Sequence, residues 1–355
     1  MQIDSAVHKH LAKFALPPLL SFGETKVPAM YTAEFRDGRW QSGHLGPYRA
    51  LEIDPASRVL HYGVEAFEGL KAYRRSQKRP HLFRPERNWE RLNRSLARLT
   101  APALPREVFF EGVGALAGIV APFIPGAPGE SLYLRPLVID TDSSLGIASP
   151  SKRYLFVVLA SPAGAYQAAP MRVLIERRSA RAMPGGTGAV KIGGNYAAAL
   201  LSNARAAERN LSTSLWLDAG THSFVEELSG MNIFFVIDGA LHTPALTDTI
   251  LPGVTRESIV QLAGDMGLEV FERQIALDDV LQDIRQGSAS EAFACGTAVT
   301  VLGIERFVED DGAAYDLAGG PGPVASRLKT ALLDIQEGRA PDPYGWTYEV
   351  PALST

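Results

Sequence analysis

The segment 185–196, with the sequence GGTGAVKIGGNY, places one lysine, Lys191, between two groups of glycines. Glycine has no side chain, so a bulky ligand can approach the backbone closely. A lysine amine that is held away from bulk water can act as a nucleophile toward a carbonyl. A flexible surface loop that happens to carry a lysine is the simpler interpretation, and the motif alone does not exclude it.

A second segment, 251–256 with the sequence LPGVTR, has the features of an anion-binding helix start. Gly253 allows a tight turn, and the amides of Val254 and Thr255 would point out of a helix N-terminus together with the helix dipole. The alternative is an ordinary Pro-Gly loop in which Thr255 is the N-cap. The segment 296–298, GTA, offers a further hydroxyl and amide after a buried strand, but it is not specific by itself.

Two adjacent acids, Glu226 and Glu227, lie at the end of a predicted strand. Neighbouring strand residues face opposite sides, so one of the two can point inward. An inward carboxylate needs a cationic partner, and a protonated pyridine nitrogen would serve. A nucleophilic lysine, a phosphate cradle and a carboxylate for a ring nitrogen together specify pyridoxal phosphate.

Two sequence motifs that bind nucleotides, the dinucleotide-binding fingerprint and the Walker motif, are absent from this chain. No Gly-x-Gly-x-x-Gly follows a strand, which excludes the dinucleotide-binding fingerprint. Lys191 is followed by Ile192 and not by serine or threonine, which excludes a Walker motif.

Length and composition narrow the class of protein. The chain has 355 residues, enough for about two domains. A net charge of −4 indicates neither a nucleic-acid nor a membrane-surface partner. No apolar run approaches the roughly 20 residues that span a bilayer, and no secretory signal is present at the N-terminus. The single cysteine, Cys295, fits a cytoplasmic location, and no His/Cys cluster has metal-ligand spacing.

Hydrophobic periodicity places the elements that must position these residues. A helix is predicted over 86–99, where Trp89, Leu92, Leu96 and Leu99 share one face, and a second helix over 106–120. Strands are predicted over 131–140 and 153–160, the first with Tyr133 and Arg135 on one face. Buried arginine is rare unless paired, which favours a role for Arg135 beyond packing. The predicted domains are 1–165 and 181–355, joined by a linker at 166–180 that begins within the uncharged segment 161–170.

The second half alternates strands and helices. The predicted elements are a strand at 171–177, a helix at 196–208, hairpins at 213–226 and 232–243, a helix from 255, a strand at 268–274, a helix at 278–285, a strand at 290–294 and a helix at 322–337. The chain is therefore expected to be an α+β protein of two domains.

Long motifs in a fixed order make the chain resemble the branched-chain aminotransferases, members of the fold-type IV pyridoxal-phosphate enzymes. The motifs are LHYGVEAFEGLKAY at 60–73, YLRPLVIDTDSSLGI at 133–147, MPGGTGAVKIGGNYAA at 183–198, VEELSGMNIFFV at 225–236, LPGVTRESI at 251–259 and GTA at 296–298. The resemblance implies a smaller N-terminal α+β domain and a larger C-terminal mixed α/β domain that carries the reactive lysine. It also implies transamination of leucine, isoleucine and valine with 2-oxoglutarate, and a homodimer or a multiple of dimers.

The resemblance also assigns roles to residues. Lys191 would bind pyridoxal phosphate as a Schiff base and carry the proton, Tyr196 would bind the phenolic oxygen of the cofactor, and Glu227 would hold the pyridinium while Glu226 faces away. The implied phosphate ligands are Arg91, Val254, Thr255 and Thr297. The implied substrate pocket consists of Phe22, Tyr62, Phe67, Tyr133, Arg135, Tyr166 and Ala298, with Ile147 of the partner subunit. For the aromatic residues, plain core packing is the alternative.

Two departures from the family pattern matter. The segment 22–30 reads FGETKVPAM where the family usually has Phe-Gly-x-x-Phe/Met-Thr-Asp-His-Met, so this wall of the pocket is altered. Val299 and Leu302 stand where some members have a Cys-x-x-Cys pair, so no thiol switch is expected. The competing functions are a D-amino-acid or amine transaminase or an aminodeoxychorismate lyase on the same fold, and a non-catalytic protein that binds pyridoxal phosphate.

Overall fold

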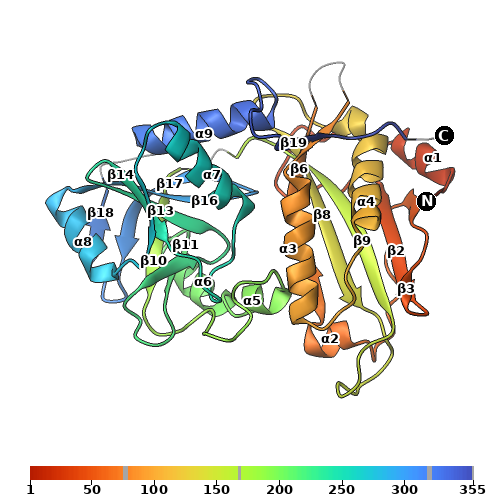
Figure 1. Cartoon of the computed structure of the whole chain (residues 1–355), viewed down its shortest axis with the longest axis horizontal. Helices are drawn as coiled ribbons and strands as arrows, with labels where there is room; N and C mark the ends of the chain where they lie inside the picture. The colour runs from red at the N-terminus through yellow and green to blue at the C-terminus, as the bar shows by residue number, and fades with distance from the viewer. Residues whose placement is uncertain (75–78, 167–168, 318–321, 354–355) are drawn as a thin grey trace. The chain divides into compact units, whose positions relative to one another are not determined.

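The computed structural model describes residues 1–74, 79–166, 169–317 and 322–353 (Figure 1). The chain forms two compact units. Unit 1 comprises Met1–Tyr166, Val190–Gly193 and Ile335–Thr355, and unit 2 comprises Gln167–Ala189 and Gly194–Asp334. The sequence-based boundaries assign all of 181–355 to one domain, whereas the structure places Lys191 and its immediate neighbours in unit 1.

Among the described residues of unit 1, ten strands form one sheet. Their order is β1-β4-β2-β9-β8-β6-β7-β19, with β3 paired to β2 and β5 paired to β8. The strands are β1 (Gln2–Ile3), β2 (Ala29–Arg36), β3 (Arg39–Trp40), β4 (His44–Pro47), β5 (Glu65–Phe67), β6 (Leu70–Tyr73), β7 (His81–Phe83), β8 (Ser131–Asp140), β9 (Tyr154–Ala163) and β19 (Thr347–Glu349). The predicted strands at 131–140 and 153–160 are confirmed, and they pair antiparallel from Ser131↔Ala163 to Asp140↔Tyr154.

The helices of unit 1 are α1 (Ala6–Leu11), α2 (Arg58–Tyr62), α3 (Pro85–Arg98) and α4 (Arg106–Ile119), with a 3₁₀ turn η1 (Ala121–Phe123). Proline at the first position of α3 presets the backbone for a helix, and Leu92 and Leu96 bury its apolar face. α4 packs across β2 and β9 (Figure 1), and it approaches so closely that a Cβ at Gly112 would overlap with the ring of Tyr31. Both predicted helices are therefore confirmed.

Unit 2 contains a second sheet, which has nine strands in the part of the chain that is described. Their order is β12-β11-β10-β17-β16-β13-β14-β15, with β18 paired to β17. The strands are β10 (Met171–Glu176), β11 (Thr213–Leu217), β12 (Val225–Leu228), β13 (Asn232–Ile237), β14 (Ala240–Pro244), β15 (Val270–Arg273), β16 (Ala289–Gly296), β17 (Thr300–Val308) and β18 (Ala314–Asp316). The two predicted hairpins are confirmed as β11–β12 and β13–β14. Sequence analysis missed β17, which lies between β10 and β16.

The helices of unit 2 are α5 (Gly193–Ala197), α6 (Leu200–Glu208), α7 (Val254–Asp265), α8 (Leu277–Gln286) and α9 (Pro323–Gln336), where the first residue of α5 and the last two of α9 belong to unit 1. The single helix predicted over 196–208 is thus interrupted between α5 and α6. α8 ends at Gly287, whose φ of 83° is the left-handed conformation that favours glycine at a helix end. It packs on β16 and β18.

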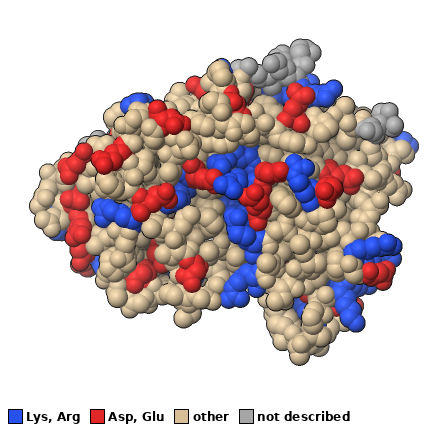
Figure 2. Space-filling model, in the orientation of Figure 1, with Lys and Arg blue, Asp and Glu red and all other residues tan. Residues whose placement is uncertain are grey.

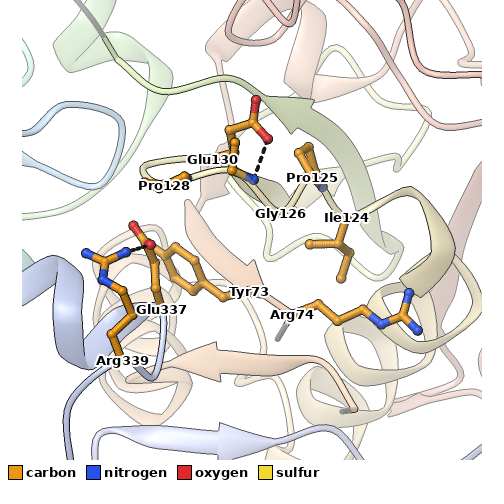
Figure 3. A pocket seen from close by; sticks show the side chains of 10 residues that line it. Tyr73, Arg74, Ile124, Pro125, Gly126, Pro128, Glu130, Glu337 and Arg339 are labelled. Carbon is orange, nitrogen blue, oxygen red and sulfur yellow. Dashed lines mark hydrogen bonds and ion pairs between the residues drawn. The ribbon is translucent and has the colours of Figure 1, made fainter. Parts of the chain in front are cut away.

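A surface pocket of about 480 Å³ lies in unit 1 between β6, the turn 124–128 and the chain after α9 (Figure 3). The two carboxylates that line this pocket, those of Glu337 and Glu130, form an ion pair or hydrogen bonds with neighbouring groups. Glu337 pairs with Arg339 and accepts a hydrogen bond from the Gly129 amide, and the Glu130 carboxylate accepts one from the Ala127 amide. The side chains that could do chemistry on a ligand lie elsewhere.

Charged side chains of both signs are interspersed over the visible face (Figure 2). Among the described residues, no helix is long and apolar enough to cross a membrane. In the same ranges, no group of three or more His, Cys, Asp or Glu side chains could hold a metal ion.

Candidate active site

Lys191 is held against unit 1 by its backbone. Its N–H donates to Ser95 Oγ of α3 at 2.9 Å, and its carbonyl accepts from the Phe67 N–H of β5 at 3.1 Å. The Lys191 Nζ lies 4.7 Å from the centre of the Phe67 ring, within the range of a cation–π interaction. These contacts fix the position of Lys191 in unit 1, which argues against a loose surface loop.

A group of aromatic rings and cations surrounds this position. The Arg135 guanidinium lies 4.8 Å from the Phe67 ring centre and 5.3 Å from that of Tyr133, and its Nη2 donates to the Tyr133 hydroxyl at 2.9 Å. The Phe22 ring meets Tyr133 edge-on, with centroids 4.7 Å apart. The structure thus brings together Lys191 and four of the predicted substrate residues of unit 1.

Arg91, the predicted phosphate ligand, is buried in an ion pair with Glu68. Its Nε lies 2.7 Å from Glu68 Oε1 and its Nη2 lies 2.8 Å from Glu68 Oε2. Asn88 donates to the same carboxylate at 2.7 Å. Burial disfavours the ionised Glu68 carboxylate, but the charge and hydrogen bonds of Arg91, the Lys191 charge and the Asn88 hydrogen bond together lower the pKa of that carboxyl. Sequence reasoning missed Glu68.

Three of the predicted substrate residues lie at the surface of unit 1. Tyr62 is 45% exposed and its hydroxyl donates to the Leu145 carbonyl at 2.5 Å. Ile147 is 63% exposed and Tyr166 is 42% exposed.

In unit 2, both acids of the pair at 226 and 227 are buried, because all four residues of β12 are covered. Burial does not distinguish the two acids, so the assignment of Glu227 to the ring nitrogen, with Glu226 facing away from the ring, stays a prediction. Glu227 Oε1 lies 2.6 Å from Arg181 Nη2, and Glu227 Oε2 accepts from Asn232 at 3.0 Å. Glu226 accepts from the Thr249 hydroxyl at 2.5 Å. Burial raises the pKa of Glu226, against the opposing effects of Thr249 and Arg181.

The hydrogen bonding around this pair is incomplete. Arg181 also donates to the Thr249 carbonyl, yet its Nε has no hydrogen-bond partner within the described ranges, and neither does Glu226 Oε2. Unpartnered buried polar atoms are costly and rare in folded proteins. Around this pair they belong to Arg181 and Glu226, whereas Glu227 Oε1 also accepts from the Leu251 N–H at 3.3 Å.

The segment 251–256 forms the expected helix start. α7 begins at Val254 with Gly253 as its N-cap, so Thr255 is not the cap. Gly253 has no side chain to cap the helix, and a Cβ there would overlap with Asn232 Oδ1. The amides of Val254 and Thr255 are thus placed to bind an anion, because the first amides of a helix have no partner within it.

Contacts between glycines and neighbouring side chains bring the other predicted cofactor residues of unit 2 near Glu227. The Tyr196 ring lies against Gly230, two residues beyond the end of β12. Gly296, which precedes Thr297 and Ala298, lies against Gly230 and Met231. Asn232, which binds Glu227, also donates to the Leu251 carbonyl at 3.0 Å. One side of unit 2 therefore collects Tyr196, Glu227, the start of α7 and the 296–298 turn.

A family model described as amino-transferase class IV matches residues 65–307, more than half of the chain. The chain belongs to the class IV aminotransferases. This class IV aminotransferase is 44% identical over 333 residues to the "Probable branched-chain-amino-acid aminotransferase" of Streptomyces coelicolor, covering 92% of this chain and 91% of the relative.

Solved structures show the same fold. The branched-chain amino acid aminotransferase of Escherichia coli superposes with a TM-score of 0.73 at 27% identity, covering 90% of this chain and 99% of the other. The T.th. branched-chain amino acid aminotransferase, complexed with N-(5'-phosphopyridoxyl)-L-glutamate, superposes with a TM-score of 0.71 at 28% identity, covering 90% and 98%. The two-domain α+β fold of type IV expected for this class IV aminotransferase is confirmed.

Sequence reasoning did not identify the residues that support the site of this class IV aminotransferase: Glu65, Glu68, Arg181, Asn232 and Thr249. Charge could have pointed to some of them. Arg181 stands shortly before the glycine segment with a small residue on each side, and buried arginine needs an acid. Asn232 and Thr249 carried no comparable signal, because their partners come from other strands.

Proposed function

We propose that this chain transfers the amino group of leucine, isoleucine or valine to 2-oxoglutarate, giving branched-chain 2-oxo acids and glutamate, with pyridoxal 5'-phosphate as cofactor. The observation that carries the proposal is the Lys191 amine above the Phe67 ring, beside Arg135 and Tyr133. Relatives named as branched-chain aminotransferases support the substrate class.

The residues present fit this cofactor. Pyridoxal phosphate supplies an aldehyde for amines and a ring that withdraws electrons when its nitrogen is protonated. Glu227 is a buried carboxylate able to hold that protonated nitrogen, and Tyr196 lies on the same side of unit 2. The uncapped start of α7 at Val254 and Thr255 suits a phosphate, with Thr297 and Arg91 as further ligands.

The chain's own groups divide the remaining work. Lys191 would attach the cofactor and move the proton at the substrate Cα, as general base and then as acid. Phe22, Phe67 and Tyr133 offer apolar surface for a branched aliphatic side chain, together with Tyr62, Tyr166 and Ala298. Arg135, with the Tyr133 hydroxyl, offers a cation for the second carboxylate of 2-oxoglutarate.

The proposed assembly is a homodimer or a multiple of dimers, with Ile147 of the partner subunit completing the pocket. Apolar side chains on the surface of each unit support it. In unit 1, Leu60, Leu145 and Ile147 are 60–63% exposed, and in unit 2, Leu200 and Leu201 are 66% and 70% exposed. Sedimentation should show dimers or larger, and an active monomer at assay concentration would contradict this. The cytoplasmic location remains part of the proposal.

A substrate panel tests the function. We expect kcat/KM with 2-oxoglutarate to be highest for L-leucine, L-isoleucine and L-valine, and to be lower for D-alanine by more than ~10-fold, because each methylene in an apolar pocket contributes about 1–3 kcal/mol to transition-state binding. The kcat/KM for L-phenylalanine tests whether the altered segment 22–30, which is expected to form one wall of the pocket, admits a larger side chain. A D-alanine value equal to that of leucine would move the chain to the D-amino-acid transaminases, and absence of any transamination would leave only cofactor binding.

A further inference from the structure

The backbone that carries Lys191 makes three hydrogen bonds to unit 1. Two of them, to Ser95 and Phe67, hold Lys191 itself. The third is made two residues later, where the Gly193 N–H donates to Glu65 Oε1. Between them, the Ile192 side chain is buried in the core of unit 1. The lysine is thereby fixed on both sides along the chain.

Strand alternation explains why one short strand can supply two of these contacts. Glu65 and Phe67 share a face of β5, while Ala66 between them is fully buried in the core. The ring of Phe67 lies beneath the Lys191 amine, and the Glu65 carboxylate lies against the Gly193 amide. β5 is held in place by its antiparallel pairing with β8, from Glu65↔Ile139 to Phe67↔Leu137.

The close approach of Glu65 also accounts for a glycine at 193. A Cβ built there would overlap with Glu65 Oε1, so any other residue would push the carboxylate away. Burial raises the pKa of Glu65, while the Gly193 hydrogen bond and the charges of Arg135 and Lys191 oppose this. A half-buried carboxylate in this place depends on those three partners.

We propose that Glu65 is a positioning residue whose carboxylate clamps the segment 191–193 through the Gly193 amide and so fixes where the Lys191 amine can lie. The clamp is independent of the proposed function. Its effect on turnover rests on that function, because it acts through Lys191.

Hydrogen exchange of peptides spanning 189–196, measured by mass spectrometry on the protein as purified, tests the clamp. Hydrogen bonds to a charged group are worth about ten- to a hundredfold in an equilibrium, so Glu65→Ala should speed exchange in this segment by ~10- to 100-fold. Glu65→Gln should restore much of the protection, because its carbonyl oxygen can still accept from Gly193. Equal exchange in Glu65→Ala and the unaltered protein would overturn the proposal.

Glu130→Ala is a matched control. It removes another carboxylate–amide hydrogen bond of unit 1, the one to the Ala127 amide at 2.9 Å beside the pocket of Figure 3. Exchange at 189–196 should be unchanged in this variant. If Glu130→Ala opened the segment as much as Glu65→Ala, the effect would be general loosening of unit 1 and the clamp would be wrong.

A double substitution tests the geometry. Gly193→Ala should lower the Tm in the presence of Glu65, and adding Glu65→Ala should recover part of that loss, since the carboxylate that overlaps with the new Cβ is gone. Identical losses in both backgrounds would contradict the clamp. In the active variants, Glu65→Ala should lower kcat more than it changes KM. A protein that shows the exchange effects but transaminates nothing would refute the proposed function and leave the clamp standing.

Discussion

Each unit buries one arginine–glutamate pair supported by an asparagine, and the two pairs differ in how completely they are satisfied. In unit 1, Arg91 meets both oxygens of Glu68, at 2.7 and 2.8 Å, and Asn88 adds a third bond. In unit 2, Arg181 meets one oxygen of Glu227 at 2.6 Å, which also accepts from the Leu251 N–H at 3.3 Å, and Asn232 binds the other oxygen at 3.0 Å. The two pairs use the same residue types. We call the pair in unit 1 closed, because the Arg91 guanidinium binds both oxygens of the Glu68 carboxylate.

We call the Arg181–Glu227 pair in unit 2 open, because polar atoms in and beside it lack hydrogen-bond partners in the described part of the chain. Arg181 is shared between Glu227 and the Thr249 carbonyl, and its Nε, like Glu226 Oε2 beside it, lacks a hydrogen-bond partner in the described part of the chain. The closed pair fixes the position of the Arg91 guanidinium, whereas around the open one polar atoms of Arg181 and Glu226 have no protein partner among the described residues.

The largest effect should come from removing the amine. Lys191→Ala should lower transamination by more than ~10⁴-fold, because imine exchange and proton transfer are both lost. The fold should persist, since the hydrogen bonds of residue 191 are made by its backbone. Turnover and a circular dichroism melt would be measured together. Residual activity above a trace would remove Lys191 from the mechanism.

The closed pair should matter most for stability. Glu68→Gln leaves the Arg91 charge without its acid in the interior, which costs about 3–5 kcal/mol of the free energy of unfolding. Urea denaturation would measure it. Glu86→Gln is the control, because Glu86 pairs with Arg106 at 2.7 Å at the surface, where both side chains are 47% exposed. The control should lose about 1 kcal/mol or less; similar losses in both variants would contradict the distinction.

The open pair should matter most for chemistry. Glu227→Gln should keep bound cofactor and lower kcat by about 10²–10³-fold, the usual range for one electrostatic contact to the reacting system. Glu226→Gln should have a smaller effect. Both acids are buried, so burial alone does not separate them. A larger loss at Glu226 would show that the wrong acid was assigned to the ring.

The smallest predicted effect is on the pH dependence of the free energy of unfolding. It should have opposite signs for the buried acids Glu68 in unit 1 and Glu226 in unit 2. The pKa of Glu68 is lowered, so its contribution to stability is present at neutral pH and is lost as the pH falls below the ordinary value of 4.5. The pKa of Glu226 is raised, so its contribution is present at low pH and is lost as the pH rises above 4.5.

Unfolding free energies of Glu68→Gln and Glu226→Gln between about pH 4 and 7 would measure these contributions. Relative to the unaltered protein, the first variant should become less stable toward neutral pH and the second more stable. Parallel curves for the two variants would contradict the opposite pKa shifts of Glu68 and Glu226.

Local sequence patterns predicted most elements of the chain. The apolar face of α3 and the Asp-Gly turn between β13 and β14 are local signals, and both gave the correct element. β17 was missed because its apolar start, at Thr300, directly follows the 296–298 turn, and its second half carries Glu305 and Arg306. Its central place in the sheet comes from pairing with β10 and β16, which lie at other points of the chain.

Sequence patterns proposed the reactive groups of the candidate site, an assignment that stays a prediction, but they did not identify the side chains that contact those groups. Lys191 and Glu227 stand in distinctive local sequence, whereas Glu65 and Arg181 acquire their meaning from Gly193 and Glu227, which lie far from them along the chain. Contacts between residues that lie far apart along the chain do not appear in the hydrophobic periodicity of the sequence. The same holds for the return of Val190–Gly193 to unit 1.

The pairing of the last described strand has a consequence for folding during translation. β19 pairs antiparallel with β7, from Thr347↔Phe83 to Glu349↔His81, so two edge partners of one sheet are separated by most of the chain. At a translation rate of roughly 5–20 residues per second, β7 waits on the order of tens of seconds on the ribosome before its neighbour emerges. During that time the nascent sheet has an open edge, the feature that most readily recruits strands from other chains.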